Sequence, residues 1–143
     1  MSYITVNQYR DLKSVGFSYP EYEHDLNSGR IFFYNNDEYF IGGFCTKEFT
    51  EMDIEVAQNG EWLPDDSQLF EWLHQTGFEI RTEAFPDNFY LYIEVIDTIN
   101  GATYHAGGCS FADAAANVIK KILKSKKREY IPEPRERFKI IKE

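Results

Sequence analysis

Three acidic side chains alternate with apolar ones in the segment EMDIEV. On an extended strand, Glu51, Asp53 and Glu55 would share one face and the apolar residues between them the other. Carboxylates on one strand face repeat at about 6.6 Å, which is close to two nucleotide rises of about 3.4 Å each. Such a row can occupy a groove that binds nucleic acid. The alternative interpretation is an ordinary solvated strand face.

The charge distribution along the chain favours a basic partner for these acids. Residues 1–119 contain 5 Lys and Arg against 20 Asp and Glu, a net charge of −15, whereas residues 120–143 contain 10 against 4, a net charge of +6. A body of negative sign attracts cationic surfaces. We therefore predict that the acidic surface binds a basic protein. Further acids expected on this surface are Asp37, Glu38, Asp65, Asp66 and Glu71.

A cationic cluster, KKILKSKKR, lies where the last helix is expected to end. The helix dipole and solvation both favour lysines there, so a solvated helix end is the simpler interpretation. The functional interpretation is a second contact with the partner. A duplex is bound by neutralising its phosphates, and the rest of the chain is acidic, so we expect no direct nucleic-acid binding. The second-contact residues are Lys120, Lys121, Lys124, Lys127 and Arg128.

Two residues suited to nucleophilic catalysis, His105 and Cys109, come close in the sequence. A histidine can activate a cysteine thiolate, and a small hydrolase with its site near these residues and the strand carboxylates is the alternative to a binding protein. No third group that would orient the histidine is evident. The other cysteine, Cys45, is 64 positions away without a CxxC motif, so we expect neither a disulfide nor a zinc site.

Motifs for metal-dependent and phosphate chemistry are incomplete. A restriction-type nuclease needs Glu-x-Lys after an upstream acid, and the sequence offers Glu79-x-Arg81. The glycine pairs at 42–43 and 107–108 lack the spacing of a phosphate-binding loop and are expected at turns or close backbone contacts. We predict no cofactor, no metal and no enzymatic activity. The strand carboxylates weighed as metal ligands are Glu79, Glu83, Glu94 and Asp97.

Helix and turn signals organise the first 60 residues. The segment TVNQYRDLKSVGF predicts a helix that Thr5 caps and Gly16 ends. The aromatic runs of RIFFYNNDEYFIGGF flank Asn35 and Asn36, residues that tolerate the positive φ of a tight turn, and so predict a β-hairpin. The strand at 51–56 would then turn at the Asn-Gly pair that follows it.

The next residues predict the order α-β-β-β-α. Asp65 and Gln68 form a capping box at the start of a helix that Gly77 ends. Strands at 78–85, 89–97 and 102–108 follow, with turn residues between them. Ser110 then caps the last helix, whose expected apolar face comprises Phe111, Ala114, Ala115, Val118, Ile119 and Ile122.

These elements predict an α+β fold, in which helices flank an antiparallel three-stranded sheet and an N-terminal helix and hairpin extend it. We divide the chain into an extension (1–60), an αβββα domain (61–127) and a C-terminal segment (128–143) in which RFKIIK predicts a short strand. No apolar run reaches membrane-span length and no secretory signal is evident, so we expect a cytoplasmic protein.

The segment from Asp65 to Lys124 resembles the double-stranded-RNA-binding domain, in which a Ser starts an Ala-rich helix packed on a three-stranded sheet. It also resembles αβββα domains of small phage and mobile-element proteins, with which we associate WLP before the first helix and TGF after it, here 62–64 and 76–78. The RNA-binding family has lysines at the start of the last helix. The corresponding residues here are Phe111, Ala112 and Ala115.

The resemblance therefore implies the fold without the RNA function. With the acidic surface, it leads us to expect a non-enzymatic protein of phage or mobile-element type. A basic, nucleic-acid-guided nuclease of host defence is one candidate partner, inhibited by nucleic-acid mimicry as anti-CRISPR proteins do. A third hypothesis is a passive oligomerising module that uses exposed aromatics. The aromatics considered for it are Phe32, Phe33, Tyr39, Phe40, Tyr90 and Tyr92.

Overall fold

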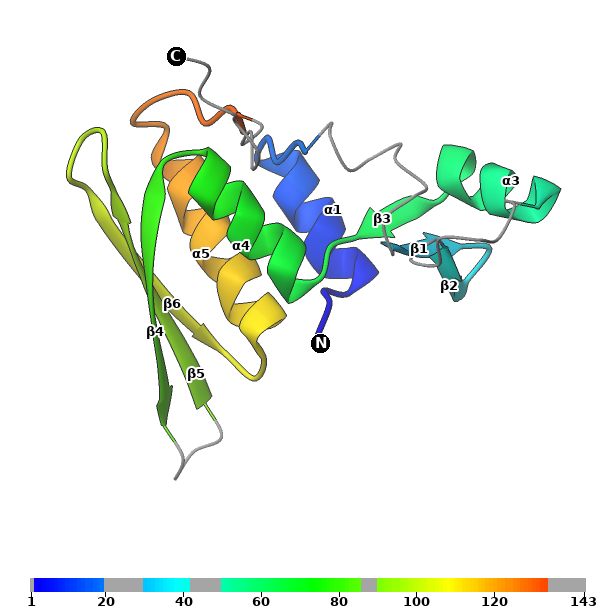
Figure 1. Ribbon diagram of the computed structural model, residues 1–143, viewed down its shortest axis with the longest axis horizontal. Helices are drawn as coiled ribbons and strands as arrows, with labels where there is room; N and C mark the ends of the chain where they lie inside the picture. Colours follow the sequence, from blue (N-terminus) through cyan, green and yellow to red (C-terminus); the bar gives the residue numbers. More distant parts are fainter. Residues whose placement is uncertain (1, 20–29, 42–49, 86–89, 134–143) are drawn as a thin grey trace, which may run out of the picture.

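Two antiparallel three-stranded sheets and four helices make up the described part of the computed structural model, which comprises residues 2–19, 30–41, 50–85 and 90–133 (Figure 1). The predicted α+β class is confirmed. None of the helices in these ranges combines the length and apolar character needed to cross a membrane. The elements are α1 (Val6–Ser14), β1 (Arg30–Tyr34), β2 (Asp37–Ile41), α3 (Glu51–Asn59), β3 (Glu61–Leu63), α4 (Asp66–Gln75), β4 (Phe78–Phe85), β5 (Tyr90–Asp97), β6 (Thr103–Gly108) and α5 (Phe111–Ser125).

The larger sheet has the order β4-β5-β6 and is antiparallel throughout. Helices α4 and α5 lie side by side on one of its faces (Figure 1). Alternate residues of β5 point toward these helices, so Ile93 and Val95 are buried, and Ala106 of β6 pairs with Ile93 in the register. The predicted α-β-β-β-α order is confirmed, with each strand within one residue of its expected bounds.

Local end signals fix the helix boundaries. Thr5 and Asp65 cap α1 and α4, each in a capping box with the glutamine three residues later. Gly16 and Gly77 have φ of +99° and +97°, a backbone conformation that side chains with a Cβ disfavour. These four predictions are confirmed. The expected strand RFKIIK lies outside the described residues.

Helix α5 begins where the sequence predicts, with the Ser110 hydroxyl accepting the Asp113 N–H at 3.1 Å. Its alanine-rich side lies on the sheet, and the predicted apolar residues from Ala114 to Ile122 are buried. Phe111 is the exception and is exposed. It is the first helical residue, with no preceding turn to cover it, and its ring contacts only the edge of Phe70 on α4 among the described rings.

The smaller sheet has the order β2-β1-β3. Asn35 and Asn36 adopt φ of 51° and 61°, which confirms the hairpin between β1 and β2. Strand β3 pairs with the other edge of β1 and places Trp62 opposite Phe32. The sequence analysis did not predict β3, because three residues are too few for a periodic pattern.

The residues from Glu51 form a helix, α3, and the prediction of a strand at 51–56 is wrong. Thr50 and Asp53 make a capping box at its start, a local signal that outweighs a two-residue alternation of only six residues. Only Val56 of α3 is buried, whereas Met52 and Ile54 are exposed. The predicted Asn-Gly turn is instead the end of this helix.

Helix α1 joins the two sheets, since it contacts both α5 and β3. The buried side chains of α1 are Tyr9 and Leu12. Beside it, the ring of Phe17 lies 6.4 Å from Trp62 of the smaller sheet and 5.6 Å from Trp72 of α4, measured between centroids. The described residues thus share one aromatic core rather than two separate ones.

Side chains of α5 cover the outer edge of β6. Asn117 donates to the Gly107 carbonyl at 2.9 Å and Lys121 donates to the His105 carbonyl at 2.7 Å. Both carbonyls lie on the edge strand of the sheet, where unpaired backbone groups would otherwise accept another strand. The helix therefore protects the edge against pairing with a second chain.

Gly108 permits the close approach of α5 to β6. A Cβ at this position would lie 2.6 Å from the backbone nitrogen of Ala114 and 2.6 Å from the carboxylate of Asp113. We expect Gly108→Ala to lower the free energy of unfolding by about 1–3 kcal/mol through overpacking, measured by urea denaturation. Thr103→Ala on the same strand is the control and should change it by less than about 0.5 kcal/mol. Equal values for the two variants would contradict the steric explanation.

Candidate functional site

The hairpin, α3 and β3 form a lobe with negative surface charge, which we call the acidic lobe (described residues 30–41 and 50–63). Within these ranges the one Lys or Arg residue is Arg30, whose exposed fraction is 1%. Helix α3 and the hairpin stand at one end of the molecule, away from the larger sheet (Figure 1). The acidic residues in the lobe are Asp37, Glu38, Glu51, Asp53, Glu55 and Glu61.

The change from strand to helix rearranges the predicted row of carboxylates. Glu51 and Glu55 are four residues apart and share one helix face, about 6 Å apart along the axis. Asp53 points elsewhere, because its carboxylate accepts the Thr50 N–H in the capping box. Glu55 also accepts hydrogen bonds from the Tyr34 hydroxyl at 3.2 Å and the Asn59 amide at 2.8 Å. Two of the three predicted acids remain available for a partner.

The other predicted acids divide into surface and structural groups. Asp37 and Glu38 are exposed at the start of β2, and the Tyr3 hydroxyl donates to Glu38. That hydrogen bond and partial burial raise the pKa of the Tyr3 phenol. Asp65 is buried at the start of α4, where burial raises the pKa of its carboxyl despite the N–H bonds it accepts. It caps the helix and does not belong to the surface.

Asp66 and Glu71 on α4 are half-buried rather than exposed. Asp66 accepts the N–H of Ser67 at 2.9 Å, and Glu71 accepts the Gln75 side-chain amide at 3.3 Å. The exposed candidates that remain are on the lobe itself. We call this set the acidic patch: Asp37, Glu38, Glu51 and Glu55.

Acidic-patch residues form no ion pair with any described residue. At the lobe's border, Arg10 of α1 donates to both carboxylate oxygens of Glu61 at 2.6 and 2.8 Å. These bonds from Arg10 hold the pKa of Glu61 below its ordinary value. Arg10 is thus paired with an acid outside the patch, and no described cation pairs with the patch itself.

Large apolar side chains are exposed on the same lobe. The exposed fractions are 54% for Phe40 on β2, 47% for Met52 and 41% for Ile54 on α3. The sequence analysis placed the last two on the buried face of a strand. The predicted strand would have buried both side chains, whereas in the helix only Val56 of that apolar set faces the core.

The predicted second contact is only partly on the surface. Lys121 and Lys124 are exposed on α5, while the ammonium of Lys120 lies 3.6 Å from the Asp11 carboxylate. The Lys127 ammonium lies 5.7 Å from the centroid of the Tyr104 ring. The fifth residue, Arg128, points into the protein.

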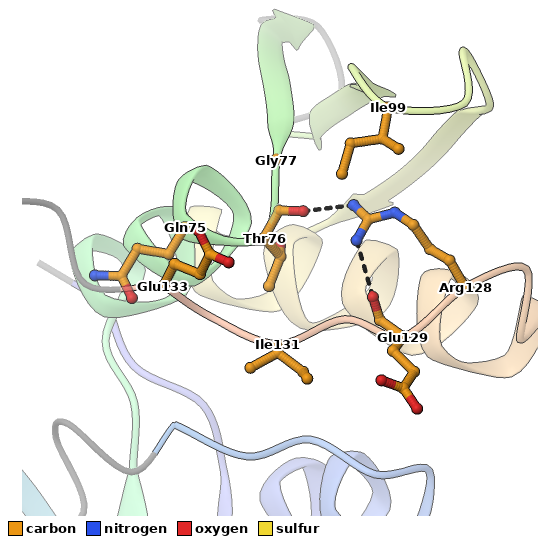
Figure 2. Close-up of a pocket in the computed structure, with 8 residues that line it drawn as sticks. All are labelled: Gln75, Thr76, Gly77, Ile99, Arg128, Glu129, Ile131 and Glu133. Atoms are coloured by element: carbon orange, nitrogen blue, oxygen red, sulfur yellow. Dashed lines mark hydrogen bonds between the residues drawn. The ribbon is translucent and has the colours of Figure 1, made fainter.

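Arg128 is one of the residues that line a pocket of about 370 Å³ between the end of α4 and residues 129–133 (Figure 2). Its guanidinium donates to the Thr76 carbonyl and to the Glu129 carbonyl, the latter at 2.9 Å (Figure 2). It also donates from Nε to the fully buried carboxylate of Asp97 at 2.7 Å and lies 4.6 Å from the Tyr130 ring centroid. Arg128 therefore ties the start of the C-terminal segment to α4 and β5, and its guanidinium is not free to contact a partner.

The Cys/His pair of the hydrolase hypothesis does not assemble. His105 lies on the open face of the larger sheet, with its ring 5.5 Å from that of Tyr92. Three extended residues, or about 10 Å, separate it from Gly108, and Cys109 lies beyond. The Cys109 thiol donates instead to the Asp113 carboxylate at 3.3 Å.

The strand carboxylates are divided between the two faces of the larger sheet, and the side chain of Glu83 lies outside the described residues. Glu79 and Glu94 lie on the open face, where Arg81 and His105 flank Glu94 in the strand register. Asp97 points inward to Arg128. Among the described residues, no group of three or more His, Cys, Asp or Glu side chains is placed to hold a metal ion.

Comparison with known proteins gives no relative. No protein-family model matches the sequence, and neither a curated protein nor a solved structure matches the chain. The resemblance to αβββα domains therefore stays a prediction.

The Asp97–Arg128 pair generates a stability prediction. Asp97→Asn leaves the Arg128 guanidinium without its counter-ion, and we expect the free energy of unfolding at neutral pH to fall by about 3 kcal/mol. Asp11→Asn is the matched control, because that carboxylate is exposed; it should change stability by less than about 1 kcal/mol. Urea denaturation of both variants measures the difference.

The effect of Asp97→Asn should also depend on pH. Burial alone would raise the pKa of Asp97, but the hydrogen bonds from Arg128 and the Ile99 N–H outweigh it and lower the pKa. The stabilisation is therefore complete above the ordinary Asp pKa of about 3.9 and is lost as the pH falls through the lower pKa of the folded protein. A stability difference between wild type and variant that grew on acidification would refute this.

Proposed function

We propose that the protein is a non-enzymatic binding protein whose acidic lobe docks on a basic protein surface. The observation that carries the proposal is the one-sided charge of the lobe: its described Lys and Arg content is a single buried arginine, while the acidic patch is exposed. Fixed negative charge on one end of a molecule steers a positive partner and sets the orientation of the complex.

The acidic patch lies beside the exposed apolar side chains of Phe40, Met52 and Ile54 on the same elements. Apolar groups bury area in an interface, and charged groups at its rim give specificity and association rate. Glu51 and Glu55 repel each other on α3, at a cost of a few tenths of a kcal/mol. A cationic partner would relieve that repulsion.

Charge also argues against a self-associating module. In a symmetric dimer the same patch meets itself, so the acids of one copy would face those of the other. A partner of opposite sign avoids this repulsion. The charge of the lobe thus favours a complex with a different protein. The exposed Phe40 side chain by itself would suit a different protein or a second copy of this chain.

Nucleic-acid mimicry is the form of binding that we infer. Glu51 and Glu55 are about 6 Å apart along the helix axis, comparable with successive phosphates, and the partner would be a basic protein at its nucleic-acid-binding surface. A nuclease of host defence fits that description, with inhibition as the consequence. The phage or mobile-element origin rests on the resemblance of the αβββα segment.

The test is capture from a bacterial lysate on the immobilised protein, followed by purification of the retained protein and direct titration. We expect a basic protein that is retained at low ionic strength and released at high ionic strength. The variant Glu51→Gln/Glu55→Gln should weaken its binding about tenfold or more, since close charge pairs across interfaces couple by roughly 1.5 kcal/mol or more.

The matched control is Glu79→Gln/Glu129→Gln, which removes two exposed acids outside the lobe. It removes the same number of negative charges and should leave the affinity within about twofold, because surface charges beyond about 10 Å are screened. Equal losses in the two variants, or binding that salt does not weaken, would rule out the lobe as the docking surface.

A further inference from the structure

A groove between β6 and α5 is lined by lysines, in contrast to the acidic lobe. It holds about 430 Å³, and we call it the lysine groove. Its floor is the edge of β6 and its wall is one side of α5. The lining residues are Ala106, Gly107, Asn117, Lys120, Lys121 and Lys124. Every titratable side chain in this set is a lysine.

We propose that the lysine groove binds a multiply charged phosphate anion. Lys120 and Lys124 are four residues apart and so share a face of α5, and Lys121 lies next to them. Three ammonium groups around one hollow provide a positive charge that a monovalent anion would not balance. Lysine binds phosphate oxygens as a compact, hydrated point charge with three donors.

The three lysines differ in how they are held. Lys121 is positioned by its bond to the His105 carbonyl, which keeps the ammonium at the strand edge. Lys120 is 3.6 Å from Asp11, a loose contact between exposed groups. Lys124 makes no hydrogen bond or ion pair with a described residue. A ligand phosphate would gain most from Lys124, and would compete with Asp11 for Lys120.

The acidity of the chain does not cancel this local field. The Debye length is about 8 Å at physiological ionic strength, so the acids of the distant lobe are screened at the groove. The residues of the groove belong to β6 and α5, and those of the acidic patch to β2 and α3. The two sites share no residue, and the proposal does not depend on the proposed function.

Tripolyphosphate is the probe, titrated into the full-length protein by isothermal calorimetry between about 50 and 200 mM salt. We expect saturable one-site binding that weakens with salt. Lys124→Gln should weaken it about tenfold, the effect of losing one charge-assisted hydrogen bond. Lys126→Gln, which removes an exposed cation just past the helix and outside the lining, should weaken it less than about twofold.

A short single-stranded oligonucleotide, titrated in parallel, distinguishes the source of the phosphate. Binding of tripolyphosphate alone assigns the groove to a small phosphate compound, whereas binding of both with the same Lys124→Gln sensitivity assigns it to phosphates of either origin. Absence of tripolyphosphate binding, or equal effects of Lys124→Gln and Lys126→Gln, overturns the proposal. Circular dichroism confirms that each variant is folded.

Discussion

The position of the acidic lobe depends on one packing contact, that of α1 and its neighbouring aromatic rings between the two sheets. Phe17 lies against Trp62 of the smaller sheet and Trp72 of α4, and buried aromatic pairs contribute about 0.5–1.5 kcal/mol beyond the area they remove from water. The lobe is therefore held as an extension of the main core, with Glu51 and Glu55 exposed on α3.

Helix α1 also separates the two kinds of charge. Its adjacent residues Arg10 and Asp11 have opposite signs and face opposite neighbours: Arg10 pairs with Glu61 on the lobe, and Asp11 approaches Lys120 on α5. Each pair is exposed and contributes little stability. Their effect is positional, because α1 presents a cation to the acidic side and an anion to the basic side.

Local chemistry made most of the fold predictable from sequence. Caps such as Asp65, turns such as Asn35-Asn36 and the positive φ of Gly77 depend on a few neighbouring residues, and each was placed correctly. The α-β-β-β-α order was predicted from such capping and turn residues. β3 escaped prediction because its three residues are a strand only by pairing with β1, a contact that no local pattern records.

The candidate site was less predictable, for a physical reason visible in α3. The alternation in EMDIEV fits a strand, but the Thr50–Asp53 capping box was the stronger signal and made a helix. That single error is why the exposure of Met52 and Ile54 was not predicted. Likewise, the sequence placed Arg128 with the surface lysines, since nothing local shows that Asp97, on β5, will meet it. Long-range pairs decide which charges are available.

The sparse burial of α3 connects the fold to the proposed function. A nine-residue helix is too short to be stable alone, and helices in proteins depend on packing of an apolar face. Here a single side chain, Val56, is buried, so the capping box and the bond between Tyr34 and Glu55 carry much of the remaining support. A surface that covered Met52 and Ile54 would supply the missing apolar contact. Binding of a partner would then also stabilise α3.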